Sequence, residues 1–323
     1  MADSPLTFVV LGGGGIVRKA YLPLLRTWPG ASLAGLYSRT RHTVDSVCLP
    51  WQIERGTTEV DELIDLRPQA AFLLTKTETH FELAQKLMRA GIDVFVEKPA
   101  TLFSTQTREL AELSETLGRV FMVGFNRRYA LLYRQAKKVF AGRLVEMCVV
   151  QKHRPSAYTD TLFYQLVQDN IHQIDLLRYL AGDAAAVHTE FERRETFIVG
   201  INASMRLANG GLGVLLASLD AGGWQEHVTL MGGGLTVEIS AFREMRVRYP
   251  DHEEVYGGDR PGQWLPELRE RGFEGEITEF FDCVRTRRKP ENDAFDSVKT
   301  QELVEGVTRA AGEDLTPSDV FIL

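Results

Sequence analysis

Four consecutive glycines follow the first apolar segment of the chain, and this feature constrains the fold most strongly. The segment Leu6–Leu11 is apolar throughout, as in a strand buried on both faces of a parallel sheet. Apolar residues at helical spacing follow over Ile16–Thr27. Gly12 and Gly14 permit a tight turn, and the helix that follows offers free N–H groups to a pyrophosphate. The spacing predicts a dinucleotide-binding turn, and a glycine turn without a ligand is the alternative.

Short apolar segments alternate with amphipathic segments as far as residue 124. Strands that alternate with helices of about 10–15 residues indicate βαβ units and a doubly wound parallel sheet. We expect strands at Ser32–Tyr37, Ala70–Leu74, Asp93–Val96 and Val120–Val123, and helices at Glu59–Leu66, Glu78–Ala90 and Thr105–Leu117.

Beyond Gly124 the pattern changes, and Val187–Tyr249 has the pattern of consecutive strands joined by short turns. Such connections predict an antiparallel sheet. We therefore expect two domains, residues 1–124 and 125–323, with C-terminal helices that can pack back on the first domain. The other elements expected here are helices at Tyr129–Phe140, Phe163–Leu180, Glu276–Arg287 and Ser297–Ala310, a strand at Leu144–Lys152 and a mobile loop at Asp251–Arg271.

The composition excludes several classes of protein. The 323 residues include 37 Lys+Arg and 44 Asp+Glu, and this mildly acidic balance argues against a nucleic-acid partner. No apolar run is long enough to span a membrane, and the first residues do not resemble a signal peptide. Cys48, Cys148 and Cys283 lie far apart, which indicates a reducing compartment and no zinc framework. We expect a cytoplasmic enzyme without a metal site.

The end of the second predicted strand bears on the choice of cofactor. Sites that prefer NAD usually carry an acidic residue here for the ribose 2′-hydroxyl. This chain has Ser38, Arg39 and Arg41 instead. A hydroxyl and two guanidinium groups suit a 2′-phosphate. The residues favour NADP(H), with NAD(H) as a second cofactor, and a solvated basic turn is the alternative.

Two further segments carry candidate catalytic groups. Lys98 lies in a Glu-Lys-Pro turn after Asp93–Val96, at the strand end that faces ligands in doubly wound sheets. A lysine placed there can serve as an acid or base. His172 lies on a helix, and Asp169 or Asp175 can orient its imidazole. A surface lysine and a buried structural histidine are the alternatives.

These segments together resemble one family. The glycine turn, Thr75-Lys76-Thr77 with His80, the Glu-Lys-Pro turn, the GFNRRYALLY segment and the QDNIHQID helix occur in the order of the Gfo/Idh/MocA oxidoreductases. Within that family the chain looks most similar to the virulence-factor MviM-like subgroup. The resemblance implies an N-terminal Rossmann domain and a C-terminal α/β domain with a large, mainly antiparallel sheet, which often forms the interface of a homodimer or homotetramer.

The resemblance also implies hydride transfer between NAD(P) and a sugar, sugar acid or cyclitol. Lys98 would hydrogen-bond the reacting oxygen, and His172 would be the acid–base group. The chain departs from the family at Gln168, where an Asp is usual, and its carboxylate is at Asp169 instead. A cofactor-binding regulator without turnover is therefore the alternative function.

The expected site combines these observations with the resemblance. The catalytic residues are Lys98, His172 and Asp169. For the cofactor we expect Gly12, Gly14, Gly15, Ile16, Ser38, Arg39, Arg41, Thr75, Thr77, His80, Glu97 and Lys98. For the substrate we expect Lys98, Arg128, Lys152, Arg154, Tyr158, Gln168 and His172.

Overall fold

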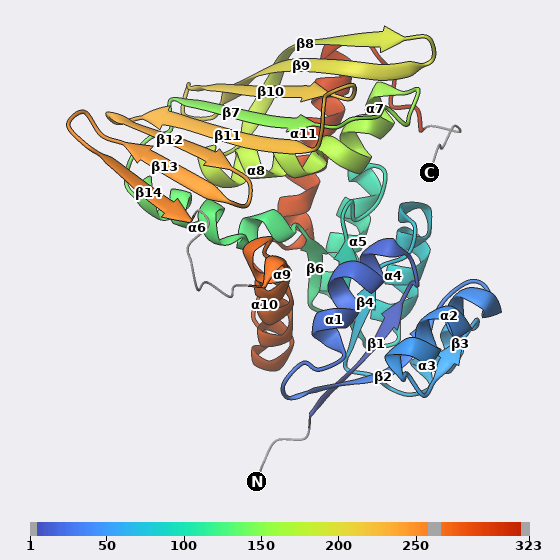
Figure 1. Ribbon diagram of the computed structural model, residues 1–323. Coiled ribbons are helices and arrows are strands. Elements are labelled where there is room, and N and C mark those ends of the chain that lie inside the picture. The colour runs from blue at the N-terminus through green and yellow to red at the C-terminus, as the bar shows by residue number, and fades with distance from the viewer. Residues whose placement is uncertain (1–4, 258–265, 318–323) are drawn as a thin grey trace. The chain divides into compact units, whose positions relative to one another are not determined.

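A parallel sheet of six strands organises the first of two units in the computed structural model, which describes residues 5–257 and 266–317 (Figure 1). The strand order is β3-β2-β1-β4-β5-β6. From β1 the successive strands are added first toward one edge of the sheet and then, from β4, toward the other, so the topological switch point at which doubly wound sheets bind ligands lies between β1 and β4. All neighbouring strands are parallel, which confirms the predicted Rossmann sheet. The strands are β1 (Leu6–Leu11), β2 (Ala31–Tyr37), β3 (Gly56–Thr57), β4 (Ala70–Leu73), β5 (Asp93–Glu97) and β6 (Phe121–Gly124).

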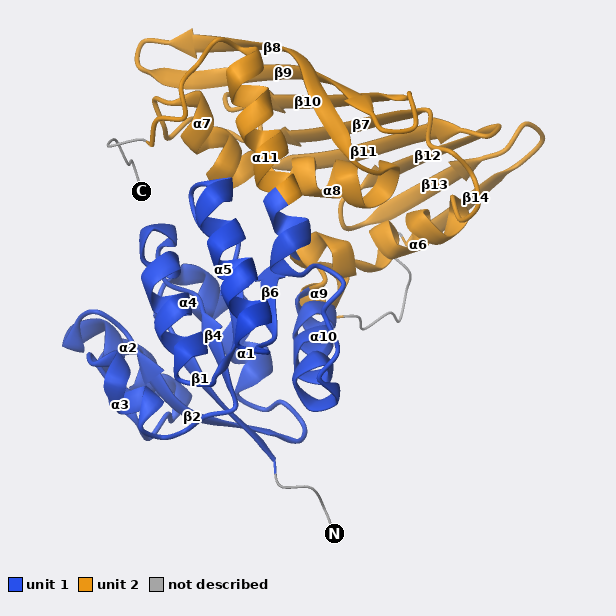
Figure 2. Ribbon diagram, turned by 180° about the vertical axis from the view of Figure 1, so that it is seen from behind, with its two compact units in different colours: residues 1–125, 273–298 blue, residues 126–272, 299–323 orange. Residues whose placement is uncertain are grey.

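The division into units assigns Met1–Phe125 and Phe273–Val298 to unit 1, and Asn126–Gly272 and Lys299–Leu323 to unit 2 (Figure 2). The helical elements of unit 1 are η1 (Val17–Tyr21), α1 (Leu22–Leu25), α2 (Arg41–Trp51), α3 (Val60–Ile64), η2 (Thr77–Thr79), α4 (His80–Arg89), α5 (Ser104–Thr116) and α10 (Phe273–Thr286). Helix α11 (Ala294–Ala310) begins in unit 1 and continues into unit 2.

Helix α2 and strand β3 were missed by the sequence prediction. Pro50 lies inside α2, which weakened the helical pattern. The helix forms nevertheless, because the Thr40 side chain accepts a hydrogen bond from the backbone N–H of Thr43 at its start. Pro50 lies in its last turn, and Gln52 ends it in the left-handed conformation.

Aromatic packing ties helix α10 to the sheet of unit 1. The Phe72 ring of β4 lies 5.2 Å from Phe280 and 5.5 Å from Phe281 between ring centroids, edge to face in both pairs. Phe8 of β1 lies 5.4 Å from Phe281. These rings are fully buried, so a helix some 200 residues from the sheet in sequence completes the same core.

Unit 2 is built on a second sheet of eight strands in the order β14-β13-β12-β11-β7-β10-β9-β8. Strands β7 and β10 are parallel and the other pairs are antiparallel, which confirms the mainly antiparallel sheet. The strands are β7 (Met147–His153), β8 (Ala184–Arg194), β9 (Phe197–Leu207), β10 (Leu212–Ser218), β11 (Gln225–Gly232), β12 (Leu235–Ser240), β13 (Glu244–Arg248) and β14 (Glu253–Gly257). The helical elements are η3 (Asn126–Tyr129), α6 (Leu131–Val139), α7 (Leu162–Gln165), η4 (Leu166–Asn170), α8 (Ile171–Ala181) and α9 (Glu267–Glu270).

The mobile loop expected at Asp251–Arg271 is wrong in part. Strand β14 extends the sheet, and α9 is a short helix. Glu253 of β14 accepts ion pairs from Arg246 and Arg248 of β13, and such charged side chains suit an edge strand. Residues 258–265 lie outside the described residues.

Two predicted helices contain π-helical turns. The first is η1, directly after the glycine turn, and the second is η4, between α7 and α8. A π turn replaces the i→i+4 hydrogen bonds by i→i+5 bonds and occurs frequently at functional sites. Both turns fall on segments that carry predicted site residues.

Candidate active site

The glycine turn of unit 1 is shaped by one close approach and one open space. Gly12 has φ +125°, and a Cβ added to it would lie 2.4 Å from the Leu74 carbonyl oxygen, so only glycine fits. A Cβ added to Gly14 or Gly15 would meet nothing within 4 Å. Gly14, Gly15 and Ile16 are exposed. The protein's own packing does not require glycine at 14 and 15, so the open space beside them fits the phosphates of a dinucleotide.

The residues after β2 divide into a paired and an open arginine. Arg41 forms an ion pair of 2.8 Å with Asp45 and donates to the Gly56 carbonyl. Arg39 is exposed, and its guanidinium makes no hydrogen bond or ion pair with the part of the chain that the structure describes. Ser38 is buried beside the glycine turn, 3.5 Å from the place of a Gly13 Cβ. Of the predicted 2′-phosphate ligands, Arg39 is therefore the one with an open guanidinium.

The Lys98 turn is fastened to the neighbouring turn by His80. The Lys98–Pro99 peptide bond is cis, and Lys98 is half-buried directly after β5. The His80 ring nitrogens lie 3.0 Å from the Pro99 carbonyl oxygen and 3.2 Å from that of Thr75. Burial lowers the pKa of His80, so the neutral ring donates to one of the two carbonyls. His80, expected to bind cofactor, is buried and connects these two turns.

Glu97, also expected at the cofactor, is buried and bonded inside unit 1. The Tyr21 hydroxyl lies 3.0 Å from Glu97 Oε1 and 2.9 Å from Glu276 Oε1. Burial, together with these two carboxyl groups, raises the pKa of Tyr21 well above its ordinary value. This cluster connects η1, the Lys98 turn and α10. Glu276 was not predicted, because nothing in the local sequence of α10 marks it as a partner of Glu97.

The remaining predicted cofactor ligands lie after β4. Thr75 Oγ1 and Thr79 Oγ1 are 2.7 Å apart, and Thr77 is buried at the start of η2. Both predicted threonines therefore lie at the carboxyl end of the strand that neighbours β1 at the switch point.

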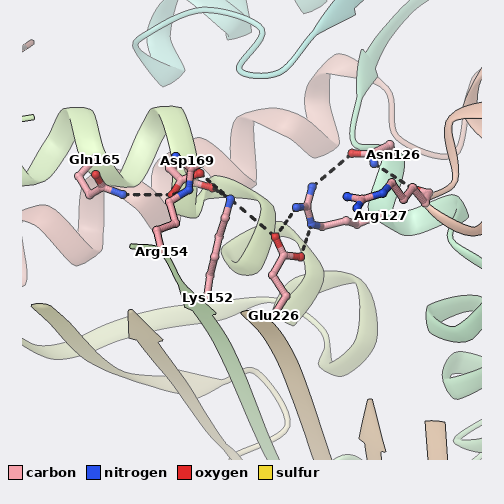
Figure 3. A network of polar contacts seen from close by, with 8 residues as sticks. Asn126, Arg127, Lys152, Arg154, Gln165, Asp169 and Glu226 are labelled. Atoms are coloured by element: carbon pink, nitrogen blue, oxygen red, sulfur yellow. Dashed lines mark hydrogen bonds and ion pairs between the residues drawn. The ribbon is translucent and has the colours of Figure 1, made fainter. Parts of the chain in front are cut away.

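In unit 2 the predicted residues meet a chain of ion pairs (Figure 3). Asp169 Oδ1 lies 2.5 Å from Lys152 Nζ, and Asp169 Oδ2 lies 3.1 Å from Arg154 Nε. Gln165 donates to Asp169 from one turn earlier. Both oxygens of Asp169 are thus engaged by the cations of β7 and the residue after it. Asp169, expected to be catalytic, holds these two cations in place.

The chain of ion pairs continues through Glu226, which was not predicted. Glu226 of β11 lies directly opposite Lys152 in the sheet register, with 3.7 Å between Lys152 Nζ and Glu226 Oε1. Arg127 binds Glu226 with two nitrogens, of which Nε lies at 2.8 Å. Burial alone would raise the pKa of Glu226, but Arg127 and Lys152 hold it below its ordinary value. Burial lowers the pKa of Lys152.

Asp175, the other predicted partner of His172, has a different role. Its carboxylate accepts hydrogen bonds from Arg128 Nε at 2.8 Å and from Thr300 Oγ1 at 3.0 Å, rather than from His172. Arg128 and Lys152 were both expected to bind substrate. Both are buried and form internal ion pairs, with Asp175 and Asp169 respectively.

Arg154, Tyr158, Gln168 and His172 remain as the substrate-facing candidates in unit 2. Arg154 is 37% exposed, and its guanidinium carbon lies 5.8 Å from the centre of the Tyr158 ring. Burial raises the pKa of Tyr158. Gln168 is half-buried and His172 is buried, four residues apart along the helix that runs from η4 into α8.

Two features are absent from the residues that the structure describes. No helix there is long and apolar enough to cross a membrane. Within the same ranges, no group of three or more His, Cys, Asp or Glu side chains is placed to hold a metal ion.

Comparison with known proteins shows which oxidoreductases the chain resembles. Residues 6–125 match the model of an oxidoreductase family with an NAD-binding Rossmann fold, GFO_IDH_MocA. A putative oxidoreductase, YceM, from Salmonella typhimurium is 29% identical over 94% of this chain and 97% of its own length. The chain is thus similar to the Gfo/Idh/MocA oxidoreductases, and residues 6–125 are the part that matches their NAD-binding model.

Two further comparisons agree with this similarity. The scyllo-inositol 2-dehydrogenase (NAD(+)) of Bacillus subtilis is 27% identical over 54% of this chain and 53% of its own length. A crystal structure of a dehydrogenase (MviM) from Clostridium difficile superposes with a TM-score of 0.86 at 23% identity, covering 94% of this chain and 99% of that one. This second likeness extends the fold of the family over both units.

The glycine turn gives a test that separates folding from cofactor binding. We expect Gly12→Ala to lower the free energy of unfolding by about 1–3 kcal/mol, because the new Cβ meets Leu74 in a strained conformation. We expect Gly14→Ala to leave stability within about 1 kcal/mol of the wild type while weakening dinucleotide binding, because its methyl group occupies the open space. Urea unfolding and calorimetric titration with NADPH measure the two effects. A Gly14→Ala protein that binds NADPH as tightly as the wild type contradicts the assignment of this turn.

Proposed function

We propose that this protein transfers a hydride between NADP(H) and a hydroxyl or carbonyl carbon of a sugar, sugar acid or cyclitol. The observation that carries the proposal is the open space beside Gly14 and Gly15, at the switch point of a doubly wound sheet. The similarity to this family supports oxidoreductase chemistry. The name of the Bacillus subtilis relative supports a polyhydroxylated substrate.

NADP(H) is proposed over NAD(H) because of the side chains after β2. Nothing acidic stands there to accept a ribose 2′-hydroxyl, and Arg39 offers an open guanidinium to a 2′-phosphate. Arg41 supports the same region from its pair with Asp45. NAD(H) is a second, weaker cofactor under this proposal.

The bound nicotinamide supplies or accepts the hydride, and the chain's own residues manage the substrate and its proton. Lys98 hydrogen-bonds the reacting oxygen and stabilises the charge that develops on it. His172 exchanges the proton of that oxygen. Gln168 can hold a neighbouring hydroxyl but cannot take its proton. Asp169 is assigned to position Lys152 and Arg154, because both of its oxygens face these cations.

The cofactor proposal predicts a measurable preference. We expect NADPH to bind more tightly than NADH, and we expect Arg39→Ala to narrow the gap by about 1.5–3 kcal/mol, the size of one charge-assisted hydrogen bond. Arg89→Ala is the matched control. Arg89 is exposed in the last turn of α4, at the end of the helix that is farther from the carboxyl ends of the strands. Calorimetric titration measures both affinities. Equal affinity of the wild type for NADPH and NADH would contradict the proposed preference for NADP(H).

The catalytic proposal predicts losses of rate without losses of binding. We expect Lys98→Met and His172→Ala each to lower kcat by about 10²–10⁴-fold, the usual contribution of a general acid–base group, while NADPH affinity changes little. Lys86→Met is the control, since Lys86 pairs with Asp61 on the surface of α4. Steady-state kinetics on a panel of sugars, sugar acids and cyclitols is the measurement. Normal turnover in the variant that lacks both Lys98 and His172 would refute these roles.

The same panel separates the enzyme from a cofactor-binding regulator. The specific observation that favours the regulator is the amide of Gln168 at the position of the family carboxylate. Gln168→Asp restores that carboxylate. Tight NADPH binding without turnover in either the wild type or Gln168→Asp would favour the regulator.

We further propose a homodimer or homotetramer joined through the sheet of unit 2. Leu212 and Met231 are 42% and 40% exposed, although the next or preceding residue of each strand is buried. Apolar side chains on one face of a sheet indicate that another surface covers them. We expect an oligomer in sedimentation at micromolar concentration, weakened by Leu212→Lys. A monomeric wild type at that concentration is the contrary result.

A further inference from the structure

The chain of ion pairs in unit 2 ends in a cation that is only partly used. The members are Arg127, Glu226, Lys152, Asp169 and Arg154, in that order (Figure 3). Three of these five side chains are cations and two are carboxylates. The series of ion pairs therefore has a net charge of one positive unit. The side chains of Arg127 and Lys152 are 9% and 3% exposed, whereas that of Arg154 is 37% exposed. The excess charge therefore meets solvent at Arg154.

The sequence register explains why Arg154 occupies this end. Lys152 and Arg154 are two residues apart, so they point to the same face of the sheet, where Asp169 receives both. The Arg154 backbone is held on two sides, since its N–H donates to Ser218 and its carbonyl accepts from Ala221. The backbone that carries the guanidinium is thus fixed before any ligand arrives.

The two terminal nitrogens of the Arg154 guanidinium are available to a ligand. Only Nε faces Asp169, at 3.1 Å, and the ring of Tyr158 lies against the group. The terminal nitrogens, Nη1 and Nη2, make no hydrogen bond with any residue in the described ranges 5–257 and 266–317. Arg127, by contrast, donates hydrogen bonds from two of its nitrogens to Glu226. A planar fork with two open donors matches a carboxylate or a phosphate group.

We propose that the substrate carries an anionic group, a carboxylate or a phosphate, and that Arg154 binds this group. The inference deepens the proposed function and rests on it: it selects sugar acids or sugar phosphates over neutral sugars and cyclitols. A neutral hydroxyl at Arg154 would leave the excess charge of the ion-pair chain uncompensated. An anion restores equal numbers of positive and negative groups.

The first test uses small anions as probes. Acetate and inorganic phosphate are titrated separately into the protein saturated with NADPH, so that the cofactor occupies the phosphate-binding turn, and binding is read from the melting temperature. We expect at least one anion to bind, and its Kd to rise by at least about tenfold in Arg154→Gln, the loss of one charge-assisted hydrogen bond. Arg154→Lys keeps the charge without the fork and should lie between the two. The probe that responds tells a carboxylate site from a phosphate site.

The control variant is Arg309→Gln, which removes the same charge from an exposed arginine that pairs with Glu305 at i,i+4 on α11. General salt effects on stability act equally on the wild type and on both variants. The same response to acetate and phosphate in wild type, Arg154→Gln and Arg309→Gln would overturn the proposal. A protein that does not bind NADPH fails the proposed function instead, and the acetate titration then still reports on Arg154.

The second test uses matched substrates, each neutral sugar being compared with its acid and its phosphate, such as glucose with glucuronate and glucose 6-phosphate. We expect the anionic member of a productive set to have the higher kcat/KM by at least about tenfold, mainly through KM, and Arg154→Gln to remove this advantage. Turnover that favours the neutral member overturns the inference while leaving hydride transfer intact. If no member of any set reacts, the anion titration decides alone.

Discussion

Taking a charged side chain out of water costs several kcal/mol unless an opposite charge goes with it, and the arrangement of unit 2 depends on this constraint. Lys152, Asp169, Glu226 and Arg127 are all buried, and each contacts an opposite charge. They come from β7, η4, β11 and η3, so the ion pairs join four segments that are up to 99 residues apart. Removing one partner of such a pair typically costs about 3–5 kcal/mol, because the other charge stays buried. The ion pairs therefore hold these segments together, and among the five members only Arg154 has a substantially exposed side chain.

The predicted site residues of unit 1 are arranged mainly by a backbone turn without side chains, whereas those of unit 2 are arranged by ion pairs. Its ligand-facing turn is defined by the Gly12 backbone against Leu74 and by the absence of side chains at Gly14 and Gly15. The polar side chains expected to bind the cofactor divide in a consistent way. His80 and Glu97 are buried and fasten turns to one another, whereas Arg39 remains open. A rigid turn supported by buried hydrogen bonds can present a backbone surface without large changes on binding.

Most of the parallel sheet was predictable because its strands are short, largely apolar runs, as at Leu6–Leu11 and Asp93–Val96, whereas the two-residue β3 has no such run. Partners distant in sequence were not. The local sequence does mark Glu226, because it alternates with the buried residues Val228 and Leu230 on the same face of β11. A carboxylate on a buried face needs a buried cation. Nothing local indicates that the cation is Arg127 or Lys152, because register between strands is set by the whole sheet. The same limit applies to Tyr21 and Glu276, which meet across 255 residues.

The π-helical turn η4 bears on how the side chains of Gln168 and Asp169 are oriented. A π turn replaces the i→i+4 backbone bonds by i→i+5 bonds, so its side-chain directions differ from those of a regular helix. The side-chain amide of Gln165 also donates to Asn170 Oδ1 at 2.9 Å. Asp169 is directed at Lys152 and Arg154, and the neighbouring Gln168 is half-buried and carries a neutral amide. An amide can orient a hydroxyl, and proton transfer requires only one titratable group at the reacting oxygen. His172 supplies such a group under the proposed function. Under the proposed function, Gln168 therefore places no negative charge beside the substrate while His172 carries the proton, and a site with less negative charge is better suited to an anionic substrate.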